Sequence, residues 1–141
     1  LDALQKRISF LEDALNRLGL KATTLHARAE DAARMAAHRE QYDAAVSRAV
    51  VNAATLEELT LPFVKKGGVA IAWKGPGVAD ELTAARRAAF LLGGTVRGTV
   101  DAPIPRRADW AHVLLLTDKT GTTPKAYPRK AGTPGKKPLG M

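Results

Sequence analysis

The sequence contains no cysteine and no acidic residue after Asp118, and aromatic residues make up 5% of it. Without cysteine there can be no disulfide, thiolate metal site or cysteine nucleophile, and this composition suits a reducing cytoplasm. No run approaches the roughly 20 apolar residues that a membrane-spanning helix needs. No cationic and apolar leader opens the sequence either. We therefore expect a cytoplasmic protein that makes no contact with a membrane.

Positive charge is concentrated at one end of the chain. The 141 residues carry a net charge of +8, and the acid-free stretch from Lys119 to Met141 supplies +6 of it. A pI near 10.1 favours nucleic acid or another polyanion as partner. Because this stretch is rich in proline and glycine, it suits a phosphate backbone better than a hydrophobic core. We expect residues 1–118 to form a domain and residues 119–141 to form a flexible or surface-draped basic tail.

The first segment has the apolar periodicity of an amphipathic helix. One face would carry Leu4, Ile8, Leu11, Leu15 and Leu18. Asp2 stands where an N-cap belongs, and Gln5 completes a capping-box pattern with it. Gly19 suits the left-handed position after the last turn.

The following segments alternate between the two kinds of secondary structure. Strands are predicted over residues 22–26, 42–46, 69–73, 95–100 and 110–116. Helices are predicted over residues 29–41, 53–61 and 78–92, with a loop at 47–49 and a turn at 65–68. Strands that alternate with helices form a parallel sheet with helices on its faces. Since no helix separates the last two strands, we expect them to be an antiparallel pair.

Several short motifs, taken in order, carry a resemblance to a known family. They are Asp2-Ala3-Leu4-Gln5-Lys6-Arg7 with Phe10-Leu11, Arg28-Ala29-Glu30, Ser47-Arg48-Ala49, Leu61-Pro62 with Lys66-Gly67-Gly68, Lys74-Gly75, and Tyr127-Pro128-Arg129-Lys130-Ala131-Gly132-Thr133-Pro134. The chain resembles the second half of the glucose-inhibited division protein B family. Its members are Rossmann-like class I methyltransferases that use S-adenosylmethionine to methylate N7 of a guanine in 16S ribosomal RNA. The resemblance implies this α/β fold, ending in an antiparallel strand pair.

One part of the family pattern is missing from the sequence. The glycine-rich loop under the cofactor's methionine part, and the family's N-terminal helices, would lie before Leu1. A close backbone approach to a ligand needs glycine, and none of this chain's glycine pairs follows a first strand into a helix. We therefore expect an N-terminally incomplete member that binds cofactor poorly and is inactive by itself.

The resemblance also implies the cofactor contacts, each of which has a simpler alternative. The implied cofactor-binding residues are Asp2, Ala3, Leu4, Ala29, Glu30 and Arg48. Asp2 would bind the ribose hydroxyls or act as a plain helix cap, and Ala3 and Leu4 would line the ribose and adenine side or simply pack. Ala29 and Glu30 would meet the adenine, although Glu30 alone is typical of a solvated first helical turn. Arg48 would bind the cofactor carboxylate or an RNA phosphate, or be a surface cation. We expect Asp2, Glu30 and Arg48 to converge on one crevice.

Four residues are candidates for contact with RNA. Lys74 would meet RNA or be solvated, Tyr127 would stack on a splayed base, and Arg129 and Lys130 would hold phosphates. Alternatively, the tail packs back on its own domain with Tyr127 as anchor. His26, His38 and His112 have no metal-ligand spacing, so we expect structural roles and no metal; Arg106-Arg107 is expected in a solvated loop.

The expected chemistry needs alignment more than a catalytic acid or base. Guanine N7 already carries a lone pair, and the sulfonium methyl is activated by the cofactor's charge. The target base would be unpaired or extruded, because N7 faces the deep groove of an RNA duplex. The partner would be the small ribosomal subunit, and we expect a monomer. One alternative is a non-catalytic RNA- or ribosome-binding module on a truncated α/β domain. Another, a nucleotide-binding oxidoreductase, would require a Gly-x-Gly-x-x-Gly turn that the chain lacks.

Overall fold

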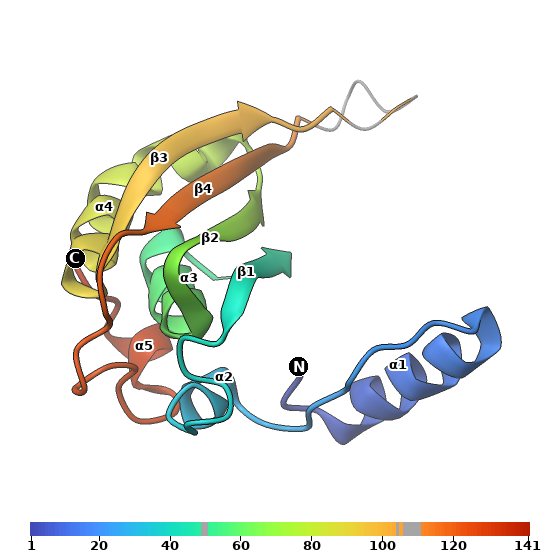
Figure 1. Cartoon of the computed structure of the whole chain (residues 1–141). Helices are drawn as coiled ribbons and strands as arrows, with labels where there is room; N and C mark the ends of the chain where they lie inside the picture. The colour runs from blue at the N-terminus through green and yellow to red at the C-terminus, as the bar shows by residue number, and fades with distance from the viewer. Residues whose placement is uncertain (49–50, 104, 106–110) are drawn as a thin grey trace.

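A mixed four-stranded sheet organises the computed structural model, which describes residues 1–48, 51–103, 105 and 111–141. Its strands are β1 (Tyr42–Arg48), β2 (Val64–Lys74), β3 (Gly94–Asp101) and β4 (Val113–Lys119), in the order β1-β2-β4-β3. β1 and β2 are parallel, whereas β4 is antiparallel to both β2 and β3 (Figure 1). The predicted antiparallel pair is confirmed.

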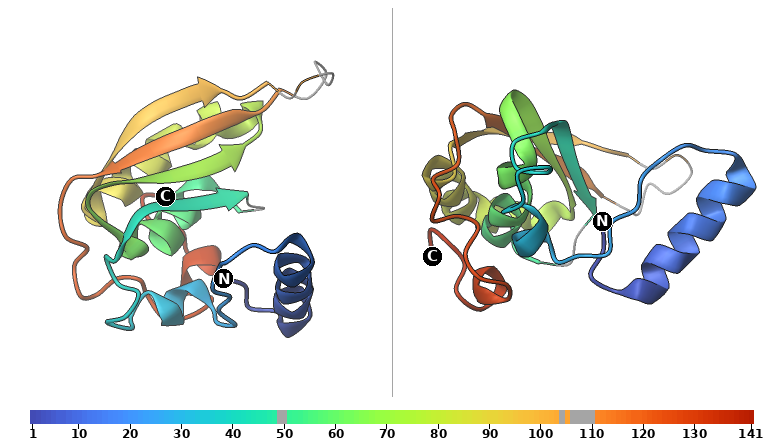
Figure 2. Two further views of the ribbon diagram at one scale, coloured as in Figure 1. Left: turned by 45° about the vertical axis from the view of Figure 1, so that its right-hand side comes forward. Right: turned by 60° about the horizontal axis from the view of Figure 1, so that its bottom comes forward.

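Two helices lie against one face of this sheet. They are α3 (Ala53–Thr60) and α4 (Leu82–Leu91), seen behind the strands in Figure 1 and beneath them in Figure 2. The Asn52 side chain caps α3 by accepting the Thr55 N–H at 2.8 Å. α3 ends at Thr60, one residue before the predicted end, and Pro62 lies in the 3-10 turn Leu61–Phe63 that follows it. α4 follows the 3-10 segment Pro76–Glu81.

The core lies between these two helices and the sheet. Its buried apolar side chains fall into two clusters, Ala53, Leu56, Ala72, Val78, Ala85 and Leu115, and Leu61, Val64, Ala70, Ala89 and Leu92. The predicted helix 53–61 and strands 69–73 and 95–100 all contribute to or flank this layer, so the sequence pattern located them correctly.

Helix α1 (Gln5–Leu18) forms as predicted but packs differently from expectation. Gly19 ends it in the left-handed conformation, with φ 64°. The capping box was wrong: Leu4 occupies the N-cap position, and no side chain caps the helix. Ile8 is 2% exposed whereas Leu18 is 69% exposed, because α1 extends away from the sheet (Figures 1 and 2).

The segment before β1 departs most from prediction. The predicted helix 29–41 is reduced to α2 (Ala29–Ala32), followed by turns that end at Glu40, whose φ of 52° lies outside the right-handed helical region. The side chains of Arg39 and Glu40 hold this irregular path by bonding to the C-terminal residues. The predicted strand 22–26 is one parallel bridge between Asp2 and His26. Residues 65–68 were predicted as a turn but belong to β2, where the register with β1 shifts between the Tyr42–Val64 and Ala44–Val69 pairs.

Other boundaries moved by a few residues. Ser47 and Arg48 lie in β1 and not in a loop. Residues 113–119 form the last strand. Ala49, Arg106-Arg107 and Trp110, for which we made predictions, lie outside the described residues.

The C-terminal stretch packs closely against the domain. It contains α5 (Thr133–Lys136), and Pro128 and Pro134 are among the fully buried side chains. Tyr127 and Leu139 pack on the cluster around Leu61. This is the arrangement of the alternative in which the tail folds back with Tyr127 as anchor.

Candidate functional site

Asp2 sits at the bridge that joins the N-terminus to His26. Its Oδ1 accepts the Leu4 N–H at 2.8 Å, and its Oδ2 accepts from Arg7 Nη1 at 3.2 Å. The Leu4 amide is the main reason why the pKa of Asp2 is lowered, and Arg7 adds to it. Asp2 is therefore a carboxylate at neutral pH that still has lone pairs free for further donors. Ala3, next to it, has its carbonyl oxygen 3.1 Å from His26 Nε2.

Glu30 points to the C-terminal stretch. It lies in α2, is 8% exposed, and its Oε1 accepts the Gly132 N–H at 2.8 Å. The solvated first-turn alternative is therefore wrong, because this carboxylate is buried. Ala29, the first residue of α2, is half-buried, and Leu4 is exposed.

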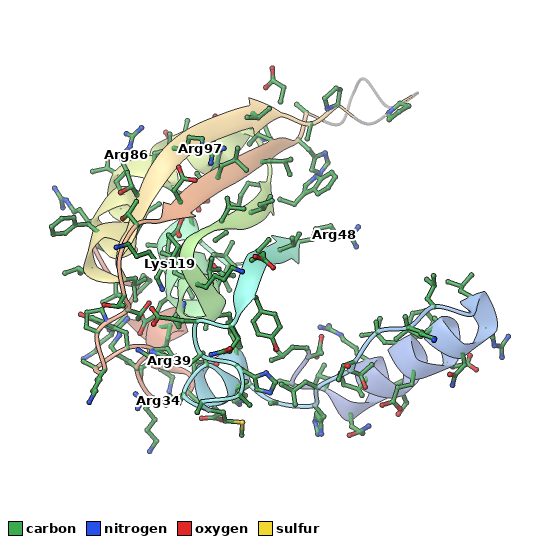
Figure 3. All side chains as sticks on the ribbon, in the orientation of Figure 1. Arg34, Arg39, Arg48, Arg86, Arg97 and Lys119 are labelled. Carbon is green, nitrogen blue, oxygen red and sulfur yellow. The ribbon has the colours of Figure 1, made fainter. Side chains whose placement is uncertain are left out.

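Arg48 is the last residue of β1. Its side chain is exposed and extends away from the sheet (Figure 3). The end of β1 pairs with Trp73 of β2, so Arg48 stands at the carboxyl edge of the two parallel strands.

The convergence of Asp2, Glu30 and Arg48 on one crevice stays a prediction. The side-chain bonds of Asp2 lie in its own turn, and the Glu30 bond runs to Gly132. An open hollow of about 600 Å³ lies between α1 and residues 20–24, and the described residues that line it include Leu15 and Asn16 but none of the six expected cofactor residues.

Lys74 is an internal residue and not the solvated strand end that we considered. It is 8% exposed, and its Nζ donates to Glu81 Oε2 at 2.8 Å and to the Val51 carbonyl at 3.0 Å. Glu81 also accepts the Ala53 N–H, so the ion pair ties the end of β2 to the start of α3. An ammonium engaged in this way does not face an RNA phosphate.

Arg129 is also engaged inside the protein. Its guanidinium forms a two-point ion pair with Glu58, whose side chain is 0% exposed, at 3.0 Å (Nε to Oε1) and 2.7 Å (Nη2 to Oε2). The hydrogen bond that Arg129 donates to Glu58 is the main cause that raises the pKa of Arg129. Such planar pairing fixes geometry as well as charge. Our expectation that Arg129 holds a phosphate is therefore not supported by its position.

Lys119 is a second internal cation of the basic stretch. Its side chain is 0% exposed and donates to Glu40 Oε1 (2.9 Å), the Leu61 carbonyl (2.9 Å) and Thr123 Oγ1 (2.6 Å). Burial lowers its pKa, and the Glu40 carboxylate opposes that effect. The cations of the stretch that remain exposed are Lys125, Lys130, Lys136 and Lys137.

Sequence reasoning missed the polar side chains of α3. Thr55, Glu57 and Glu58 are all buried: the C-terminal stretch covers Thr55 and Glu58, whereas Glu57 faces β4 of the sheet. Glu57 accepts from Thr117 Oγ1 at 2.7 Å, and desolvation raises its pKa to about 7. The sequence did contain one signal for this contact. Because the C-terminal stretch has no acidic residue, any ion pair of Arg129 must use a carboxylate from elsewhere in the chain, and Glu57-Glu58 is the acidic pair in the helix that follows β1.

The described parts of the chain contain no cluster of three or more histidine, aspartate or glutamate side chains that could hold a metal ion. Within the same ranges no helix is both long and apolar enough to cross a bilayer. His26 and His38 make local contacts, the latter with its Nδ1 2.7 Å from the Tyr42 hydroxyl.

A sequence model of the GidB family, described as rRNA small subunit methyltransferase G, matches residues 1–107. The chain belongs to this family. Proteins named ribosomal RNA small subunit methyltransferase G from Clostridium perfringens (strain 13), Clostridium botulinum (strain Loch Maree) and Leuconostoc citreum are 47%, 49% and 44% identical to it over 140 residues. Each alignment covers 99% of this chain and 58% of the relative.

The chain also resembles a solved structure. That protein comes from work on the conversion of a disulfide bond into a thioacetal group during echinomycin biosynthesis, and the superposition has a TM-score of 0.58 with 14% identity. It covers 84% of this chain and 65% of that one, and at this identity it bears on the fold alone. With the mixed sheet, it supports the Rossmann-like α/β methyltransferase fold that we expected.

Proposed function

We propose that the protein to which this chain belongs transfers a methyl group from S-adenosylmethionine to N7 of a guanine in 16S ribosomal RNA. The family match over residues 1–107 is the observation that carries the proposal. The chain spans 58% of the length of the relatives above, so the activity is proposed for the whole protein. Residues 1–118 would be its share of the methyltransferase domain, and residues 119–141 its basic tail. Because its substrate would be ribosomal, the protein would act in the cytoplasm. We also propose that it acts as a monomer.

Three groups of this chain suit the cofactor. The Asp2 carboxylate is ionised and can accept from two ribose hydroxyls, with Ala3 and Leu4 beside it. Ala29 would meet the adenine through its backbone. Arg48 is exposed and has no hydrogen bond or ion pair among the described residues, so its guanidinium is available for a carboxylate or phosphate.

In this reaction these residues would bind and orient the cofactor and exclude water from it. The bound cofactor would supply a methyl group already activated by a positive sulfur. Guanine N7 attacks with its own lone pair, so no side chain needs to remove a proton first. In-line alignment accounts for the rate gain. This agrees with a chain whose buried carboxylates, Glu30 and Glu58, hold protein groups instead of facing outward.

The exposed lysines of the C-terminal stretch are the proposed RNA contacts. Lys130 stays from our expectation, and Lys125, Lys136 and Lys137 join it in place of Lys74 and Arg129, which are engaged internally. Such cations fix position on the phosphate backbone without reading sequence. Tyr127, packed on the core, would serve as anchor of the tail and not as a stacking platform.

The experiment is methyl transfer from labelled S-adenosylmethionine to under-methylated small ribosomal subunits by the full-length protein, with the modified atom mapped. Arg48→Ala should lower the activity or raise the KM for the cofactor. Arg97→Ala is the matched control, since Arg97 pairs with Asp118 on the exposed surface of the sheet. Absence of label at N7 would refute the enzyme and favour the non-catalytic RNA-binding module.

A further inference from the structure

From the start of α2 to Glu40, just before β1, side chains form hydrogen bonds mainly with the C-terminal stretch. We define the strap as residues 119–137 and the held segment as residues 29–40. Arg39 donates from Nη1 to the Tyr127 carbonyl at 2.9 Å, and from Nη2 to the Thr123 carbonyl at 2.8 Å and the Pro124 carbonyl at 3.2 Å. A single guanidinium thus satisfies three strap carbonyls, which is the fork geometry that arginine offers and lysine does not.

Both ends of the held segment have their own bonds to the strap. At its start Glu30 accepts the Gly132 N–H at 2.8 Å, and at its end Glu40 Oε1 accepts the Thr123 N–H at 2.7 Å and the Lys119 ammonium at 2.9 Å. Arg34 donates to the Pro128 carbonyl. Figure 3 shows both labelled arginines of the segment, Arg34 and Arg39, in the region where α2 and the strap meet.

The strap in turn is fixed to α3. Arg129 pairs with the fully buried Glu58, and Thr55 Oγ1 donates to the Pro134 carbonyl at 3.1 Å. Pro128 and Pro134 are buried against the domain. The strap therefore has a rigid support on one side and the held segment on the other.

The backbone of the held segment alone would give it little order. α2 has four residues, too few to be stable without outside contacts. The segment also bonds directly to the 3-10 turn before β2, where the Glu40 N–H donates to the Pro62 carbonyl at 2.9 Å. This bond lies at the opposite end of the segment from Glu30. Arg39 Nη1 also donates to the carbonyl of Ala33, the residue after α2, at 3.3 Å. Besides the packing of Ala32 and Ala33, which are fully buried, the polar bonds at the start of the segment thus involve Gly132 and Arg39.

We infer that Glu30 and Arg39 are positioning residues, through which the strap holds the Ala29-Glu30 backbone in the place where it receives the adenine of the cofactor. This rests on the proposed function for the identity of the ligand. Glu30 acts through its bond to Gly132 and not by touching the cofactor with its carboxylate. Arg39 acts from the other end of the segment.

The test compares Glu30→Ala, Arg39→Ala and the control Arg97→Ala in the full-length protein. Hydrogen–deuterium exchange should rise by roughly fivefold or more over residues 28–40 in the first two variants, since each removes hydrogen bonds between the segment and the strap. It should stay unchanged over β3 and β4 in these two variants, and unchanged over residues 28–40 in Arg97→Ala, whose pair with Asp118 lies between β3 and β4. Equal exchange over residues 28–40 in wild type and both variants would overturn the inference.

Calorimetric titration with S-adenosylmethionine supplies the second readout. Affinity should fall about fivefold or more in Glu30→Ala and Arg39→Ala, and the KM for the cofactor should rise while kcat at saturation stays within about twofold. Glu30→Gln keeps the acceptor for the Gly132 N–H and should restore both exchange and affinity. Raised exchange with unchanged affinity, or a fall in kcat alone, would overturn the positioning role.

Failure of the proposed function and failure of this inference give different results in these experiments. If wild-type protein fails to bind S-adenosylmethionine, the proposed function fails, and the exchange data still decide whether the strap holds the segment. If an alanine variant exchanges globally, Arg39→Lys decides. A lysine ammonium is a single donor atom and cannot stand in both places that Nη1 and Nη2 of Arg39 occupy, so it should loosen residues 28–40 alone. A wild-type exchange pattern in Arg39→Lys would then overturn the inference.

Discussion

At the level of single residues, two adjacent glutamates of α3 have very different surroundings. Glu58 is paired with Arg129, whereas Glu57 receives one hydrogen bond from Thr117 and its Oε2 has no partner among the described residues. Burial without a cation favours the neutral form, so the pKa of Glu57 is raised from 4.5 to about 7. Glu57 is thus the residue of α3 that couples folding to pH.

The free energy of unfolding should therefore fall as the pH rises from 4.5 to about 7. Below pH 4.5 the Glu57 carboxyl is protonated in both states; between pH 4.5 and about 7 the unfolded chain releases the proton that the folded chain retains. The folded state should lose roughly 3 kcal/mol over this interval. Glu57→Gln should abolish that loss and be the more stable protein at pH 8 in urea unfolding. Asp80→Asn, at an exposed position, is the control; parallel stability curves for wild type and Glu57→Gln would contradict the prediction.

The Glu58–Arg129 pair gives a second prediction at this scale. Arg129→Met should destabilise the protein by about 3–5 kcal/mol, because it leaves the buried Glu58 carboxylate without a counter-charge, with only the backbone N–H of residue 129 still donating to it. Arg129→Met combined with Glu58→Leu should recover much of that loss. Urea unfolding of both single variants and the double variant gives the coupling energy. Strictly additive effects would show that the pair does not act as a unit.

At the level of elements, local sequence patterns predicted those that bury an apolar face. The apolar stretches within β2 and α3 were correct because their periodicity reflects burial in the core. The helix 29–41 was wrong because Arg39 and Glu40 find partners more than 80 residues away along the chain, in contacts that local propensity does not encode. The same holds for the site: Arg48 could be placed at a strand end, whereas the burial of Lys74 and Glu30 depends on tertiary partners.

The irregular part of β2 offers a test at the scale of a strand pair. A Cβ at Gly68 would collide with the Asp43 carbonyl oxygen of β1 and lie 2.7 Å from Val64 Cγ1. Gly68→Ala should therefore destabilise the protein by about 1–3 kcal/mol. Gly75→Ala is the matched control, because a Cβ there meets nothing within 4 Å and the backbone φ is −82°. Equal melting temperatures for the two variants would show that β1 and β2 can separate at this point without cost.

At the level of the whole molecule, the cations of the C-terminal stretch divide into those paired within the protein and those exposed to solvent. Lys119 and Arg129 hold the C-terminal stretch to Glu40 and Glu58, while Lys125, Lys130, Lys136 and Lys137 face outward. Composition revealed the excess of charge but not this division, because both kinds of cation occur in the same stretch. The division separates the cations that hold the fold from those that we propose to contact RNA.

Replacing the four outward lysines with glutamine should weaken RNA binding and flatten its dependence on salt. For each phosphate that the variant no longer neutralises, the slope of log K against log salt should become shallower by about 0.7–0.9. Stability should change by less than about 0.5 kcal/mol per site, since these side chains are exposed. Filter binding of small-subunit RNA between low and physiological salt measures the slope. An unaltered slope would leave the stretch with a packing role alone.

The ion pairs of Lys119 and Arg129 also determine how a protease attacks this end of the chain. Trypsin cleaves after both residue types, yet it must first draw the peptide into an extended form, which their packing resists. Brief digestion should therefore nick the C-terminal stretch after Lys125 and spare the bonds after Lys119 and Arg129. The two fragments should still co-elute in size-exclusion chromatography, because Arg129 of the C-terminal fragment stays paired with Glu58.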